Sequence, residues 1–194
     1  EFRGGLISNL SPLQQGTNAV GSATKLQNYE PSKEGGYKKV LGYEKYIDDT
    51  VAGTGPMLGV AVINPTKVVA VRENDSGASE YYINVSSSWT SLGAASNLGG
   101  KVRSKDFNFD GTHKKIFVDG NNIPAIFEDD TDTLSFPTGY PSDVVGAEHV
   151  EIFKKHVFVS KGASLSFSVP FDETDFSVAL GGCLSQTGHT VTGL

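Results

Sequence analysis

Apolar and polar residues alternate with a period of two in several short stretches of the chain, and this period is typical of half-buried β-strands. In three stretches a basic residue leads into β-branched and aromatic residues: Thr66–Val71, His113–Val118 and Lys155–Ser160. When they are aligned on Lys67, Lys114 and Lys155, they recur about every 40 to 50 residues. The chain therefore contains an internal repeat.

Further strand candidates surround each of these stretches. A strand is predicted before each one, at Leu58–Ile63, Val102–Phe109 and Val145–Phe153. A third strand is predicted at Tyr81–Val85, Ile123–Phe127 and Leu165–Val169, and a weaker fourth strand at Trp89–Leu92, Thr133–Phe136 and Asp175–Val178. Four short strands per repeat are typical of β-propeller blades. An antiparallel sandwich is the alternative, although it does not require strands in groups of four.

The predicted fold is all-β, a propeller-like array of four-stranded antiparallel blades with an extended N-terminal arm. We expect blades at residues 57–98, 99–142 and 143–186, followed by the start of a further strand. Propellers have at least about four blades, so three blades indicate either part of a larger propeller or an open array.

Residues 1–56 lack clear alternation and are interrupted by Gly, Asn, Ser and Pro. We expect an arm with the first strands, packed against its own propeller or a neighbouring subunit. Spaced apolar residues near its start could each fill a pocket on such a neighbour. These candidate assembly residues are Phe2, Leu6, Ile7, Leu10 and Leu13.

Composition and charge argue against some classes of protein. The chain has 194 residues, a net charge of -6 and no block of Lys and Arg, whereas a sequence-specific DNA-binding protein usually has a basic face. With one cysteine, Cys183, an intrachain disulfide is impossible. No apolar run approaches the roughly 18 to 20 residues that span a bilayer, so no membrane insertion is expected.

The segment DFNFDG, residues 106–111, fits the opening of a calcium loop. A complete EF-hand loop would have Glu at its twelfth position, which is Phe117 here. Phe107 and Phe109 alternate with polar residues, as in a strand with its phenylalanines inward. We therefore interpret the segment as a strand that turns at Asp110–Gly111 into the next strand, with a looser calcium site as the alternative.

Other polar groups have weaker interpretations. His149 and Glu151 share one strand face and could bind a metal, but a solvated pair is the simpler interpretation. The acidic turn at 128–132 is interpreted as a solvated turn, with cation binding as the alternative, and the acidic turn at 172–175 as the link between two strands. No catalytic, P-loop or zinc motif occurs. The sequence predicts no catalytic residue, no metal and no cofactor.

Several phrases resemble one family, the tail nozzle, packaged-DNA stabilisation or tail tubular B-like proteins of short-tailed bacteriophages. The N-terminal phrases are FRGGLISNLSP and LQNYEPSKEGGYKKVLGYEKY, where the order NYEPS, EGGY, GY and KY is the most specific part. The later phrases KIFVDGNNIPAIFED and SLSFSVPFDETDFS are similar to that family's blade strands. The resemblance covers nearly the whole chain.

The resemblance implies a structural virion protein that is assembled in the bacterial host cytoplasm and is not an enzyme. It implies a ring, expected to be a hexamer, below the portal–adaptor complex, in contact with the adaptor or connector and other tail proteins. Such a ring closes the DNA exit channel and helps to retain packaged DNA until ejection, when double-stranded DNA passes through the lumen without sequence-specific binding. The alternative is a propeller-fold tail protein that degrades polysaccharide or binds a receptor.

Overall fold

The structure is a computed structural model that describes residues 27–31, 33, 37–42 and 44–194. The chain divides into two compact units, residues 1–46 and residues 47–194. In the first unit, β1 (Tyr29–Pro31) pairs antiparallel with β2 (Tyr37–Lys39). Lys38 and Glu30, directly opposite each other, form an ion pair of 3.2 Å between Nζ and Oε1.

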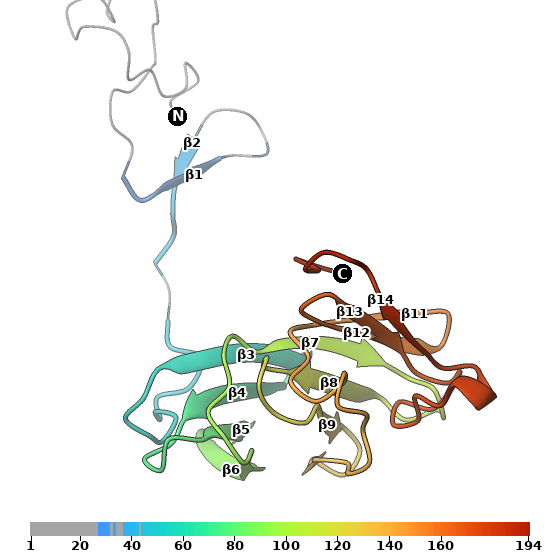
Figure 1. Cartoon of the computed structure of the whole chain (residues 1–194). Helices are drawn as coiled ribbons and strands as arrows, with labels where there is room; N and C mark the ends of the chain where they lie inside the picture. The colour runs from blue at the N-terminus through green and yellow to red at the C-terminus, as the bar shows by residue number, and fades with distance from the viewer. Residues whose placement is uncertain (1–26, 32, 34–36, 43) are drawn as a thin grey trace, which may run out of the picture. The chain divides into compact units, whose positions relative to one another are not determined.

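The second unit contains three four-stranded sheets, each an antiparallel meander of consecutive strands (Figure 1). The first sheet is β3 (Met57–Asn64), β4 (Lys67–Glu73), β5 (Ser79–Val85) and β6 (Ser88–Ala94). The second sheet is β7 (Arg103–Phe107), β8 (Lys114–Val118), β9 (Ala125–Glu128) and β10 (Thr133–Ser135). The third sheet is β11 (His149–Phe153), β12 (His156–Lys161), β13 (Ser164–Phe167) and β14 (Cys183–Gln186).

The all-β prediction is confirmed. The described residues contain no α-helix, only the single-turn 3₁₀-helix η1 (Val178–Leu180). Within that part of the chain, no helix is long and apolar enough to cross a membrane. The first three strands of every repeat overlap their predicted positions.

The predicted fourth strand of the third repeat, Asp175–Val178, is wrong, because that strand is β14, eight residues later in the chain at its first residue, Cys183. The Asp172 carboxylate accepts hydrogen bonds from the backbone N–H groups of Thr174 and Asp175, and Asp175 accepts one from Ser177 N–H. Side-chain acceptors of this kind favour turns over strand ladders. The predicted further strand after residue 186 is also absent, since residues 187–194 form bends and coil.

The segment DFNFDG has the predicted strand-and-turn conformation. Phe107 ends β7 with 5% of its surface exposed, and its ring lies 4.9 Å from that of Phe109. In the turn, Asn108 Oδ1 accepts a 2.8 Å hydrogen bond from Gly111 N–H. Gly111 has a φ of +99°, which a glycine adopts without the strain that a Cβ would cause.

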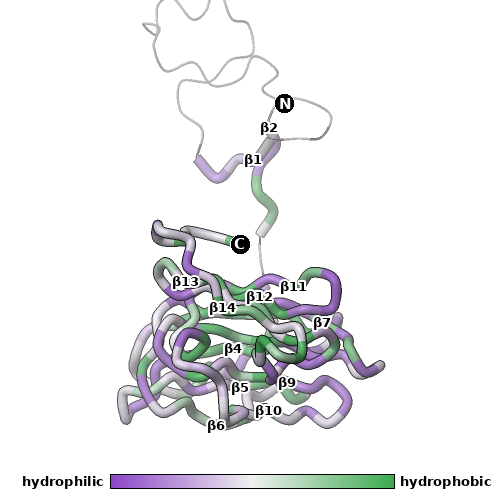
Figure 2. The backbone as a smooth tube through the Cα atoms, turned by 45° about the vertical axis from the view of Figure 1, so that its right-hand side comes forward, coloured by the Kyte–Doolittle hydropathy of each residue, from purple (hydrophilic) through white to green (hydrophobic). Residues whose placement is uncertain are grey.

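The sheets stack face to face through two apolar cores, and Figure 2 shows hydrophobic residues gathered on the strands with hydrophilic ones in the connecting loops. The second sheet contributes to both cores because its residues alternate between its faces. Phe117 packs with the first sheet, in the core of Ala61, Ile63, Val69, Val71, Tyr81, Ile83, Ala95, Phe117, Ala125 and Phe127. Ile116 and Val118 pack with the third sheet, in the core of Phe107, Ile116, Val118, Ile126, Val144, Ala147, Val150, Val157, Val159 and Phe176.

The first strands of neighbouring sheets lie beside each other, since β7 contacts both β3 and β11. Residues 47–56, which lead into β3, also pack on the first sheet. Arg72 of β4 donates from Nε to Gly55 O at 2.8 Å and from Nη1 to Val51 O at 2.6 Å. The compact unit therefore begins before β3, and the result is an open, propeller-like array of blades.

Candidate functional site

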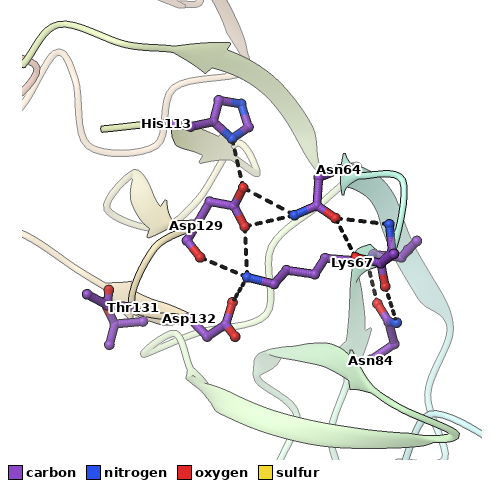
Figure 3. A network of polar contacts seen from close by, with 10 residues as sticks. Asn64, Lys67, Asn84, His113, Asp129, Thr131 and Asp132 are labelled. Carbon is purple, nitrogen blue, oxygen red and sulfur yellow. Dashed lines mark hydrogen bonds and ion pairs between the residues drawn. The ribbon is translucent and has the colours of Figure 1, made fainter. Parts of the chain in front are cut away.

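A lysine at the start of β4 connects the first sheet to the second. Lys67 Nζ donates to the backbone oxygen of Asp129 at 2.8 Å and to its Oδ1 at 2.9 Å, and lies 2.7 Å from Asp132 Oδ1 (Figure 3). The side chains of Lys67 and Asp129 are only 28% and 17% exposed. The ammonium group is thus surrounded by oxygen atoms of the neighbouring sheet.

Two more side chains converge on the Asp129 carboxylate. Asn64 Nδ2 donates to both of its oxygens, at 3.0 and 3.2 Å, and His113 Nδ1 lies 3.3 Å from Oδ2. Desolvation alone would raise the pKa of Asp129, but the hydrogen bonds from Lys67, Asn64 and His113 outweigh it and hold the pKa below its ordinary value. Asn84 fixes the same corner of the first sheet by donating to Thr66 O at 2.8 Å and accepting from Val68 N–H.

The same strand position connects the second sheet to the third. Lys114, the first residue of β8, lies 2.8 Å from Asp110 Oδ2 and 3.1 Å from Glu173 Oε1. The side chains of Lys114 and Glu173 are 15% and 14% exposed. Burial would lower the pKa of Lys114, but its hydrogen bonds to both carboxylates keep the pKa above its ordinary value.

In the third sheet this position belongs to His156, the first residue of β12. The sequence alignment on Lys155 is therefore wrong by one residue. Lys154 and Lys155 form the turn before β12 with φ values of +47° and +68°. His156 Nδ1 lies 2.6 Å from Ser168 O, and its ring lies 5.3 Å from that of Phe167.

The outer face of the third sheet, which is the face that carries His156, repeats the pattern of the buried faces. Two residues after Lys67, Lys114 and His156 stand Val69, Ile116 and Phe158, in the order of the three sheets. Val69 and Ile116 are fully buried between sheets. Phe158 lies on the outer face with its ring 5.1 Å from Phe167 and 6.5 Å from Phe153. Phe153 is 59% exposed.

The acidic turn at 128–132, predicted to be solvated, has a partner instead, and so does the 172–175 turn, which lies between β13 and β14 as predicted for a link between strands. Asp129 and Asp132 of the 128–132 turn bind Lys67, and Glu173 of the 172–175 turn binds Lys114. Lys67 therefore occupies the turn at which the sequence left cation binding open. Within the described residues, no group of three or more His, Cys, Asp or Glu side chains is arranged to hold a metal.

His149 and Glu151 also bind different partners. They lie on the same face of β11, but His149 Nδ1 is 3.1 Å from Ser160 Oγ, and Glu151 Oε2 is 2.6 Å from Lys105 Nζ. Hydrogen bonding to Lys105 lowers the pKa of Glu151.

The candidate assembly residues of the arm cannot be placed by geometry, since Phe2, Leu6, Ile7, Leu10 and Leu13 lie outside the described residues. Sequence patterns did not single out Asn64 or the ion pair between Lys114 and Glu173, because these contacts join turns that lie far apart in the chain. The alternating cations of KVRSK, residues 101–105, were not predicted as a site either. Cations at every second position could have predicted a positively charged strand face.

Comparison of the sequence with protein-family models and with curated proteins finds no match. A functional assignment therefore rests on the residues themselves.

Proposed function

We propose that this chain is a structural, non-enzymatic component of a bacteriophage tail that assembles as a ring of the nozzle or hub type. The family resemblance of residues 2–46 and of the later strand phrases motivates the choice. The observation that carries the assembly role is the outer face of the third sheet. This face continues the pattern by which the other sheets stack, yet Phe153 on it remains exposed.

The contacts between sheets suit a structural role under mechanical stress. Each interface combines an apolar core with a lysine held by two carboxylates, at least one of which belongs to the next sheet. Apolar packing supplies most of the stabilisation, at about 25 cal/mol per Å² of buried apolar surface. The ion pairs fix which residues face each other, because an unpaired charge in a half-buried position is costly.

In the proposed assembly, the ring is a hexamer in the virion that contacts the adaptor and closes the DNA exit channel until ejection. The N-terminal arm is proposed to lie along neighbouring subunits. Ordering such a segment costs on the order of 1–2 kcal/mol per residue. Burying the five apolar side chains, at roughly 1.5–3 kcal/mol each, and pairing the arm with a sheet edge would offset that cost.

A phage complementation assay with electron microscopy of the particles tests this function. Replacing Phe2, Leu6, Ile7, Leu10 and Leu13 together by Ala keeps the chain length, and we expect this variant and a deletion of residues 1–15 to fold but to yield particles without complete tails. Substituting polar residues of the same segment, Gln14→Ala and Gln15→Ala, provides the matched control and should give normal tails. Normal tails that contain the five-alanine protein would contradict the arm's role. Absence of the wild-type protein from purified virions would contradict the function itself.

A further inference from the structure

Three cationic residues alternate along one edge of the second sheet. Lys101 lies in the bend that precedes β7, whereas Arg103 and Lys105 belong to the strand and fall on the same face of it. Arg103 and Lys105 stand about 6.6 Å apart, because a strand advances about 3.3 Å per residue, and with Lys101 they form a positive stripe along one groove. This positive stripe contrasts with the net charge of -6 of the whole chain.

The stripe lines a groove of about 530 Å³ where the first strands of the three sheets meet. Val60 of β3 forms one wall, His149 and Val150 of β11 form another, and residues 192–194 lie at the side. The groove combines cations with small apolar walls and has no Phe, Tyr or Trp among the residues that line it.

The cations retain hydrogen-bonding capacity for a ligand. Lys101 is exposed, and no described residue forms a hydrogen bond or ion pair with its ammonium group. Arg103 uses one N–H, from Nη1 to Glu148 O at 2.8 Å, out of the five that a guanidinium offers. Lys105 is paired with Glu151 but its side chain is still 45% exposed. Glu151 is the carboxylate that opposes the charge of Lys105.

We propose that this groove binds the phosphodiester backbone of double-stranded DNA without reading its sequence. Duplex DNA carries one negative charge per about 1.7 Å of helix axis, so a linear row of cations can release condensed counterions from it. The lining has no Phe, Tyr or Trp, and this argues against the stacking of successive unpaired bases that single-strand-binding surfaces use. The groove adds a DNA contact to the proposed tail function, but its charges do not depend on ring assembly.

Fluorescence anisotropy of a labelled duplex of arbitrary sequence, titrated with the isolated full chain, tests the groove. We expect weak binding, with a dissociation constant on the order of 10⁻⁴ to 10⁻⁶ M near physiological salt. Lys101→Gln should reduce the slope of log K against log salt by about 0.9, because one phosphate contact is lost. Glu151→Gln removes the opposing charge and should strengthen binding, which mere destabilisation of the fold would not do.

Lys39→Gln provides the control, since Lys39 is an exposed cation in the other compact unit. It should leave the slope unchanged. The proposal is overturned if Lys101→Gln and Lys39→Gln reduce binding equally, or if the duplex does not bind even at about 50 mM salt. It is also overturned if heparin binds through Lys101 while the duplex does not. Because the measurement needs no ring, its failure would leave the complementation result intact.

Discussion

The two interfaces that β8 makes with its neighbours are alike in their cores and different in their polar edges. Phe117 faces the first sheet and the adjacent Ile116 faces the third, each about 1% exposed. At both interfaces a lysine bridges two carboxylates, but only at the first do two further side chains, Asn64 and His113, bind one of those carboxylates, Asp129. The comparison indicates that apolar burial makes sheets stack, while different polar groups set the alignment at each interface.

Truncating the two adjacent core residues should give the largest effects. Phe117→Ala should cost about 3–5 kcal/mol and Ile116→Ala about 2–5 kcal/mol in unfolding free energy. The Phe117 ring packs edge-on against Tyr81 at 5.6 Å, so its loss opens a cavity at the first interface.

Urea unfolding measures these costs, and native-state hydrogen exchange separates the interfaces. Phe117→Ala should raise exchange in the first sheet more than in the third, and Ile116→Ala should do the reverse. Identical exchange patterns in the two variants would contradict the assignment of these residues to different interfaces.

Removing single carboxylates should show which of the two interfaces depends more on its polar contacts for stability. Asp129→Ala should cost about 1.5–3 kcal/mol, because Asn64 and His113 lose their charged acceptor, although Asp132 still pairs with Lys67. Glu173→Ala should cost less, about 1 kcal/mol, since Asp110 still pairs with Lys114. The exposed neighbour Asp130 provides the control, and Asp130→Ala should change thermal stability little. A larger loss for Glu173→Ala than for Asp129→Ala would reverse the proposed order.

Protonation of Asp129 at the first interface should account for part of the loss of stability at low pH. The pKa of Asp129 is lower in the folded chain than its ordinary value of about 3.9. Its stabilisation is therefore complete above about pH 5 and is lost as the pH falls through the lowered folded-state pKa. Asp129→Asn should make the fall in unfolding free energy at low pH less steep, as measured by the midpoints of urea unfolding. If stability fell just as steeply with pH in Asp129→Asn, other carboxylates would be responsible for the loss at low pH.

Local patterns predicted much of the fold. Alternation located eleven of the twelve blade strands within a few residues, because one face of each is buried. The glycine-containing turn of DFNFDG was predictable because its chemistry is local. The segment at Asp175–Val178 was not, because side-chain hydrogen bonds to neighbouring N–H groups compete with the strand pattern there.

The polar network was less accessible to sequence reasoning. Lys67 and Asp129 are 62 positions apart in the chain, and their contact depends on how one sheet stacks on the next. The confusion of Lys155 with His156 has a related cause. Positive φ values at Lys154 and Lys155 place both lysines in the turn, and a shift of one residue moves every side chain to the opposite face.

The smallest expected change in stability concerns the outer face of the third sheet, compared with its buried counterpart in the second. Phe107 and Phe153 both end the first strand of a sheet and pair with the first residue of the second strand, Lys114 or His156. Phe107 is 5% exposed and Phe153 is 59% exposed. Phe153→Ser should therefore alter unfolding free energy by no more than about 0.5 kcal/mol, whereas Phe107→Ser should cost several times more.

Light scattering gives this comparison a second readout. Removing an exposed apolar ring should reduce concentration-dependent association of the isolated chain, because exposed apolar patches drive contact between molecules. Lys154→Gln, next to Phe153 on the same turn, tests whether charge rather than apolar area is responsible, and it should leave association unchanged. If Phe153→Ser destabilised the fold as much as Phe107→Ser, the outer face would already be packed within the chain, and it could not serve as the assembly surface.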